Sequence, residues 1–408
     1  MHYKTRKMIL ILFLIISLIA LTGCQKSIDF DEKADFNTMV EEAEGTLVTF
    51  YGWGGDDQQN KWIDTVVTPT VKEKYDITLK RVPIDIDQVL SKLSGEKQAN
   101  KTKGSIDIIW INGENFYSAK ENGFLHGPFT HKLPNYEKYM NPNDEEVTKD
   151  FGFPIEGYEA PFSKAQLVLI KDAATTPETP KNTAELLAYA KKYKGKVTYP
   201  APPDFTGSAF VRNIIYDIVG FEELNTIKAD KAKIKQTIMP AIEYMRELNQ
   251  YLWNEGKTFP ATVAQLDNMF ADGEVVMNIS YAPYSVANFI ANGTYRETVQ
   301  AFQFDKGTIG NTNYLAIAQN APNKQGALVV INEILSAEMQ ASKLRHLKAL
   351  PVVDYNKLSL AEKQLFDEVE MGEGCISQDE LLSKRIPEIP ANLVPIIEEI
   401  WQEEVVKK

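Results

Sequence analysis

The feature that most limits what this chain can fold into is a repeated alternation of short apolar strands and helices. Three runs of strand length are mostly apolar, at residues 46–51, 77–82 and 106–111. A helix is predicted from about Asp57 and another over residues 87–100, and Pro69 is expected to end or kink the first of them. Strands that alternate with helices are typical of a parallel α/β sheet.

The same alternation begins again after a stretch rich in Pro, Asn and acidic residues at 134–150. Further strands are predicted at residues 165–170, 196–199 and 274–279. Helices are expected from Thr183 to about Tyr193 and from Phe205 onward, where apolar residues recur at helical spacing. A strand over 308–319 and a helix over 325–347 follow. The sequence therefore predicts a second α/β lobe.

The N-terminus has the pattern of a secretory signal. Lys4, Arg6 and Lys7 precede an apolar run over residues 8–20, which ends in Leu-Thr-Gly-Cys24. The run falls short of the roughly 20 residues that a membrane-spanning helix needs. An uncleaved signal anchor is the alternative interpretation. Residues 24–45 are polar and acidic, which is typical of a tether.

Charge and cysteine content exclude several classes of function. The formal net charge is −12, and removal of the basic signal makes the chain more negative still, which argues against nucleic-acid binding and favours cationic or neutral ligands. The chain has two cysteines, so acylation of Cys24 would leave Cys375 without a disulfide partner. Cys375 is then expected to be a small buried residue that fills space in a core. His126 and His131 are expected in a solvated loop. We therefore expect no metal and no cofactor.

Several blocks resemble the extracellular solute-binding proteins of the maltose, spermidine and iron type, in particular the YnjB-like branch. They are residues 156–161 (EGYEAP), 179–186 (TPKNTAEL), 200–213 (PAPPDFTGSAFVRN) and 310–314 (GNTNY). Leu-Thr-Gly-Cys24 is similar to a bacterial lipobox, which implies cleavage before Cys24 and lipid on its sulfur. The chain would then be held extracytoplasmically at the cell membrane.

This resemblance implies a type II periplasmic-binding-protein-like fold, in which two α/β lobes joined by crossing strands close on a ligand. The crossings are expected at residues 158–165 and 307–314, with a third near 387–390. The first lobe would comprise residues 46–157 and 311–385. The second would comprise residues 158–310, possibly with 386–408. The implied function is non-catalytic: the protein binds a small solute and delivers it to ABC permease subunits.

Candidate ligand-binding residues of the first lobe follow its predicted strands, because ligands bind beyond the carboxyl ends of parallel strands. Glycines there let backbone N–H groups approach a ligand, and aromatic faces can stack on it. Simpler interpretations are a tight turn, core packing of Trp53 and helix capping by Asn112. The candidates are Gly52, Trp53, Gly54, Gly55, Trp110, Asn112 and Glu114.

Two further candidates lie on the first crossing, four open a helix of the second lobe, and two follow a strand of that lobe. Tyr158 and Glu159 would face the cleft, unless Glu159 is a structural charge of the hinge. The helix start offers free N–H groups, and aromatic rings in a loop after a strand suit recognition of a ring or an apolar group, although plain capping or packing explains the same residues. The second-lobe candidates are Phe205, Thr206, Gly207, Ser208, Tyr281 and Tyr284.

Two other functions are compatible with the predicted scaffold. A secreted hydrolase or lyase would need a nucleophile or metal constellation, and neither G-x-S-x-G nor HExxH occurs. A surface sensor or adhesin could use the same fold. Aromatic and acidic residues favour a thiamine-like or polyamine-like solute, with sugars as an alternative and ferric iron less favoured.

Overall fold

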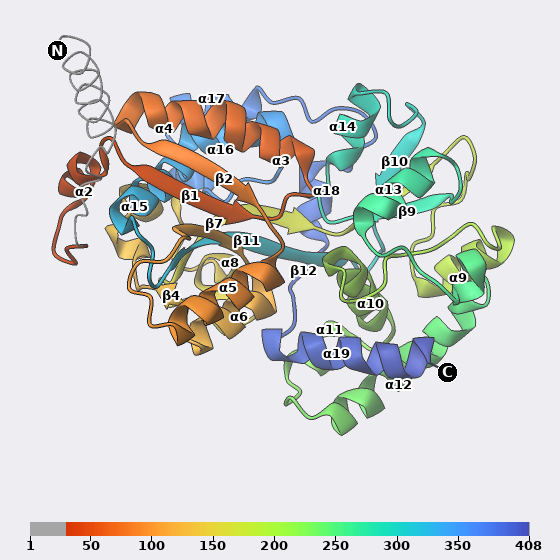
Figure 1. Cartoon of the computed structure of the whole chain (residues 1–408). Helices are drawn as coiled ribbons and strands as arrows, with labels where there is room; N and C mark the ends of the chain where they lie inside the picture. The colour runs from red at the N-terminus through yellow and green to blue at the C-terminus, as the bar shows by residue number, and fades with distance from the viewer. Residues whose placement is uncertain (1–29, 408) are drawn as a thin grey trace, which may run out of the picture.

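The computed structural model describes residues 30–407 and has two lobes with separate hydrophobic cores (Figure 1). The predicted signal and Cys24 lie outside the described residues. The first core spans Met39 to Phe162 and resumes from Tyr314 to Phe366. The second core contains Leu167 to Ile309 and returns from Ile376 to Val405. Ile376 and Leu381, expected in the first lobe, therefore pack in the second.

A mixed sheet forms the centre of the first lobe, in the order β12-β11-β3-β1-β2. β1 pairs in parallel with β2 and with β3, as expected, whereas β11 pairs antiparallel with β3. The strands are β1 (Leu47–Gly52), β2 (Thr78–Pro83), β3 (Ile108–Ile111), β4 (Leu125–His126), β11 (Thr308–Ala318) and β12 (Arg385–Ile386). The carboxyl ends of β1 and β3 thus lie at one edge of the sheet.

Helices cover both faces of this sheet. They are α2 (Phe36–Ala43), α3 (Asp57–Trp62), α4 (Thr68–Tyr75), α5 (Ile86–Gln98), α6 (Gly113–Glu121), α7 (Pro134–Tyr139), α8 (Glu145–Thr148), α15 (Lys324–Ile334), α16 (Ala337–Leu347) and α17 (Leu360–Asp367). Pro69 does not end its helix, because α3, a π-helical turn over Ile63–Val67 and α4 follow one another without a break. Pro69 lies just after that π-helical turn, which is the local irregularity of the helix. The helix expected over 325–347 is two helices, since the Ser336 side chain caps α16.

The second lobe has a small antiparallel sheet, in the order β10-β8-β9. Its strands are β8 (Val168–Asp172), β9 (Met277–Ser280) and β10 (Val299–Phe302). The strand predicted over 196–199 is absent from the described structure. The Val197 carbonyl accepts from the Trp253 N–H and the Lys196 carbonyl from the Val276 N–H, so irregular segments satisfy this backbone.

The helices of the second lobe surround that sheet. They are α9 (Thr183–Lys192), α10 (Phe205–Ile218), α11 (Phe221–Asn225), α12 (Lys231–Asn249), α13 (Val263–Ala271), α14 (Ser285–Ala291), α18 (Gln378–Ser383) and α19 (Val394–Trp401). α10 is buried almost throughout and α19 packs against α12. The C-terminal helix therefore belongs to the second lobe, through Ile397, Ile400 and Trp401.

Two strands connect the lobes side by side, and a third strand pairs alongside them. β7 (Glu159–Gln166) pairs antiparallel with β11, from Gln166 opposite Gly310 to Glu159 opposite Ala316. β12 pairs in parallel with the start of β11. The chain passes between the two cores along β7 and along β11. It returns to the second core between Phe366 and Ile376, so the third crossing, expected near 387–390, lies earlier in the chain and before β12. Figure 1 draws β11 and β12 between the lobes.

Residues 36–43 differ from the tether expected over 24–45, because they form α2 on the surface of the first lobe. Met39 and Ala43 are fully buried and α2 packs along α15. The Asp35 side chain caps the helix by accepting from the Thr38 N–H. Across residues 30–407 we find no helix with the length and hydropathy that crossing a membrane requires.

Candidate functional site

The start of α6 lies at the boundary between the lobes. Gly113 has φ +60°, a backbone conformation that favours glycine, and a Cβ there would lie only 2.9 Å from the Phe151 ring. A larger residue would therefore be strained and would collide with Phe151. The Gly113 N–H donates to Asp150 Oδ2. The Phe151 carbonyl in turn accepts from the Ala391 N–H of the second lobe at 3.0 Å. α6 is thereby placed against the segment that follows β12.

Six polar residues gather across this boundary, and we call them the interlobe cluster. They are Glu114, Ser208, Arg212, Tyr281, Glu388 and Glu398. Arg212 binds both carboxylate oxygens of Glu388, at 2.8 and 3.0 Å, and the Tyr281 hydroxyl donates to Glu388 Oε1 at 2.8 Å. Ser208 donates to Glu398 Oε1 and accepts from Arg212 Nη1. Arg212 is the single cation of the cluster.

Glu114 is the member of this cluster that the first lobe supplies. Its Oε2 is buried and has no hydrogen-bond partner among the described residues. Burial raises the pKa of Glu114 to about 7, although the positive charge of Arg212 opposes that effect. Glu398 and Glu388 raise the pKa further by repulsion. Glu114 Oε2 is thus a buried acceptor without a donor, and its carboxyl interacts electrostatically with charged residues of the opposite lobe.

Asp150 and Glu159 form a second, deeper pair of carboxyls. Glu159 was expected to face the cleft, but its side chain is 0% exposed and neither of its oxygens has a partner among the described residues. Burial, then repulsion by Asp150, raises the pKa of Glu159. The neighbouring Tyr158 ring packs on Gly127 and under the Lys120 ammonium, 5.2 Å away. The two hinge candidates therefore lie inside the first lobe.

The glycine loop after β1 folds compactly within the first lobe. A Cβ on Gly55 would overlap the Trp53 ring, and one on Gly54 would lie 2.6 Å from Pro83. Gly52 faces Trp110, whose ring contacts Phe162. Trp53 itself is 39% exposed, so it is not a core residue. The loop leaves one aromatic ring open at the carboxyl end of the sheet.

Asn112, at the end of β3, is the N-cap residue of α6, but its side chain does not cap the helix. Its Nδ2 instead donates to Asn313 Oδ1 at 2.8 Å. Asn313 belongs to β11, so this contact fixes the α6 start to a crossing strand.

The start of α10 is closed rather than open to an anion. Asp204 Oδ1 accepts from the Gly207 N–H at 2.9 Å, and a Cβ on Gly207 would overlap the Pro200 carbonyl. Thr206 is buried. The Phe205 ring packs edge-on to Tyr281, with centroids 5.2 Å apart. Asp204 therefore caps α10 and accepts from the helix-start N–H that was predicted to bind a ligand.

Tyr281 and Tyr284 have different surroundings. Tyr281 joins the interlobe cluster, whereas Tyr284 lies in the second core at 1% exposure with an unpartnered hydroxyl. Cys375 Sγ lies 4.0 Å from the Tyr284 carbonyl in the same region. Cys375 is half-buried, and burial raises the pKa of its thiol.

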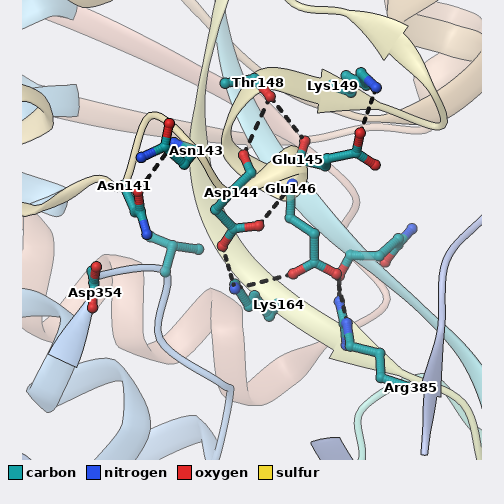
Figure 2. A network of polar contacts seen from close by, with 12 residues as sticks. Asn141, Asn143, Asp144, Glu145, Glu146, Thr148, Lys149, Lys164, Asp354 and Arg385 are labelled. Carbon is teal, nitrogen blue, oxygen red and sulfur yellow. Dashed lines mark hydrogen bonds and ion pairs between the residues drawn. The ribbon is translucent and has the colours of Figure 1, made fainter. Parts of the chain in front are cut away.

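An ion-pair network holds the crossing strands on another side (Figure 2). Glu146 of α8 pairs with Lys164 of β7 at 3.0 Å and with Arg385 of β12 at 2.5 Å. Arg385 also donates to the carbonyl of Asn311 on β11. Lys164 lines a cavity of about 260 Å³ together with Asn141, Asp144 and residues 352–356. β7, β11 and β12 therefore meet at this network.

The structure brings Glu114, Phe205, Ser208 and Tyr281 of the predicted residues together. Sequence reasoning missed Arg212, Glu388, Glu398 and Asp150. Arg212 had a visible signal, because a lone charge among Phe210, Val211 and Ile214 of an apolar helix must find a buried partner. Within residues 30–407, no group of three His, Cys, Asp or Glu side chains has an arrangement that could hold a metal ion.

Two α/β lobes joined by crossing strands, with a polar cluster between them, are the architecture of the periplasmic binding proteins. A putative spermidine/putrescine transporter protein from Listeria monocytogenes has the same fold, with a TM-score of 0.61, 15% identity and 89% and 99% of the two chains covered. A periplasmic thiamin binding protein matches with a TM-score of 0.61, 15% identity and 88% and 96% coverage. AfuA from Actinobacillus pleuropneumoniae, with fructose 6-phosphate bound, matches at 0.60, 14% identity and 88% and 98% coverage.

Sequence comparison defines the family. The model for bacterial extracellular solute-binding proteins matches residues 68–357. Protein YnjB of Escherichia coli K12 is 35% identical over 312 residues, which cover 76% of this chain and 80% of that protein. The chain belongs to the bacterial extracellular solute-binding protein family, and the predicted fold and solute-binding function are confirmed.

Proposed function

We propose that this protein binds a small cationic organic solute between its lobes and delivers it to the permease of an ABC-type importer. The observation that carries this proposal is the buried, unpartnered Oε2 of Glu114, whose carboxyl interacts electrostatically with charges across the lobe boundary. A polyamine-like or thiamine-like ligand fits this chemistry. The spermidine/putrescine and thiamin proteins of the same fold bind such solutes according to their names.

Charge in the interlobe cluster favours a cation over an anion. Glu388 is neutralised by Arg212, while Glu398 accepts only from the neutral Ser208 hydroxyl. Glu114 adds a further carboxyl, so acidic groups outnumber the one cation. A buried carboxylate is stable when it is paired, and a ligand ammonium or thiazolium would supply that pairing for Glu114.

Aromatic rings complete the proposed site. Phe205 and Tyr281 pack together beside the cluster, and Trp53 is exposed at the carboxyl end of β1. Such rings attract cations and cover the apolar part of an organic solute. Closure of the lobes then removes the ligand from water, and the closed form is the one that docks on the permease.

Binding is tested by calorimetric titration of the purified protein with spermidine, putrescine, thiamine, maltose and fructose 6-phosphate. We expect a cationic solute to bind. Glu114→Gln should weaken that binding about 30-fold or more, because removing one partner of a buried charge pair costs roughly 2 kcal/mol or above. Glu121→Gln, on the exposed end of the same helix, should change nothing. Tight binding of fructose 6-phosphate alone would reject the cation proposal.

Lipid on Cys24 holds the protein outside the cytoplasmic membrane in this proposal. Two or three acyl chains give stable anchoring at a bilayer surface. Cys24→Ser should move the protein expressed in bacteria from the detergent phase to the aqueous phase of a temperature-induced detergent partition. An unchanged distribution would contradict the anchor.

A further inference from the structure

The N-terminal segment 30–46 is bound along the first lobe instead of leading freely away from it. The Phe30 ring packs edge-on to His126, with centroids 4.9 Å apart. Lys132 forms an ion pair with Glu32 at 3.7 Å. α2 then lies along α15, with Met39 and Ala43 in the first core.

The end of this segment is also fixed. Asn323 Nδ2 donates to Thr46 Oγ1 at 2.8 Å and to the Leu47 carbonyl at 3.1 Å. β1 begins at Leu47 and ends at Gly52, on the side of the lobe boundary. The segment is therefore held at the end of the first lobe that is remote from the interlobe cluster. Figure 1 places α2 and α15 at one end of the molecule and α12 at the other.

Chain length limits how far this end can stand from a lipid anchor. Only residues 25–29 separate Cys24 from Phe30. A chain of this length spans at most about 20 Å when fully extended. A long tether would let either lobe face the membrane, whereas this short one connects to a segment that is already docked.

We propose that the docked segment 30–46 sets the orientation of the protein on the bilayer, with the first lobe next to the membrane and the second lobe away from it. This inference rests on the proposed anchor at Cys24. The membrane-facing surface comprises the exposed residues of α2 and of the 3-10 turn Thr130–Lys132. The occupant of this surface is the lipid bilayer.

The test measures distance from the bilayer by energy transfer, using the lipidated full-length protein in a Cys375→Ser background. Donor dyes are attached at Glu121→Cys, on an exposed site of the first lobe near β4, or at Lys233→Cys on exposed α12 of the second lobe. The vesicles contain phosphatidylcholine and phosphatidylglycerol with a trace of acceptor-labelled lipid. We expect clearly stronger donor quenching at position 121 than at position 233.

A second variant changes only the tether. Twenty Gly-Ser residues inserted between Lys26 and Ser27 add a root-mean-square reach of about 25 Å without touching the docked segment. The difference in quenching between the two dye positions should then shrink. Equal quenching at both positions in the original, vesicle-bound protein would overturn the orientation while leaving the anchor intact. Recovery of the protein away from vesicles would overturn the anchor and the orientation with it.

Discussion

Arg212 and Glu388 form a two-point ion pair in which both side chains are only 1% exposed. Arg212 comes from α10, and Glu388 from the segment that follows β12. The pair therefore joins that segment to the second lobe beside the proposed ligand site. The Tyr281 hydroxyl donates a further hydrogen bond to Glu388, and the Ser208 hydroxyl accepts one from Arg212.

We expect Arg212→Ala to lower the free energy of unfolding by about 3–5 kcal/mol, because Glu388 would be left charged and unpaired inside the protein. Urea denaturation measures the change. Arg296→Ala removes an exposed partner of Asp172 and should cost less than about 0.5 kcal/mol. Equal losses in the two variants would show that burial of the pair is energetically unimportant.

Stability of the ligand-free protein should fall as pH rises from about 4.5 through 7. The pKa of Glu114 is raised to about 7 from an ordinary 4.5, so folding favours its protonated form. This contribution is complete below pH 4.5, is lost as the carboxyl ionises, and amounts to roughly 3 kcal/mol. Thermal unfolding at pH 5 and pH 8 should show a smaller difference for Glu114→Gln than for the original protein. A bound cationic solute should reverse the trend, since it pairs with the ionised form.

Glu146→Gln should weaken the attachment of α8 to the crossing strands. Burial would raise the pKa of Glu146, but Arg385 and Lys164 outweigh that effect and hold it below the ordinary value. Its contribution is therefore present above pH 4.5 and is lost on acidification. At pH 7 we expect a loss of about 1–2 kcal/mol in urea denaturation. Glu145→Gln is the control, because Glu145 is the exposed neighbour of Glu146 and its side chain pairs only with Lys149 in Figure 2. A similar loss of stability in that variant would contradict the role of the network.

Trp53→Ala should weaken binding of the cationic solute without destabilising the fold. Trp53 is 39% exposed and is not part of a core, and cation–π stacking contributes about 0.5–2 kcal/mol, or up to roughly 30-fold in affinity. Calorimetric titration and thermal unfolding of the same variant separate the two effects. Unchanged affinity would remove the loop after β1 from the site.

The strands of the first lobe could be predicted closely, because each is a short apolar run whose ends are marked by its neighbours in the sequence. β1 and β2 are each displaced by only one residue from their predicted bounds. The second lobe was harder, since residues 196–199 have strand composition but receive their hydrogen bonds from distant irregular segments. The break at Ser336 depends on one serine cap inside an otherwise helical pattern.

The candidate site was predicted in part for a similar reason. Polar and aromatic residues at the ends of strands and the starts of helices are visible in a sequence, and Glu114, Ser208 and Tyr281 of that set lie at the lobe boundary. Their partner Glu388 lies about 180 residues from Arg212 along the chain. Only tertiary folding joins such residues, and only packing reveals that Glu159 is enclosed.

The pairing of β7, β11 and β12 has a mechanical consequence. Because the strands are hydrogen-bonded to one another, they form a ribbon and not three independent linkers. A ribbon bends readily about an axis in its plane and perpendicular to its strands, but it resists sideways displacement and torsion. The lobes should therefore open and shut along one path, so that residues such as Glu114 and Arg212 return to the same mutual position each time.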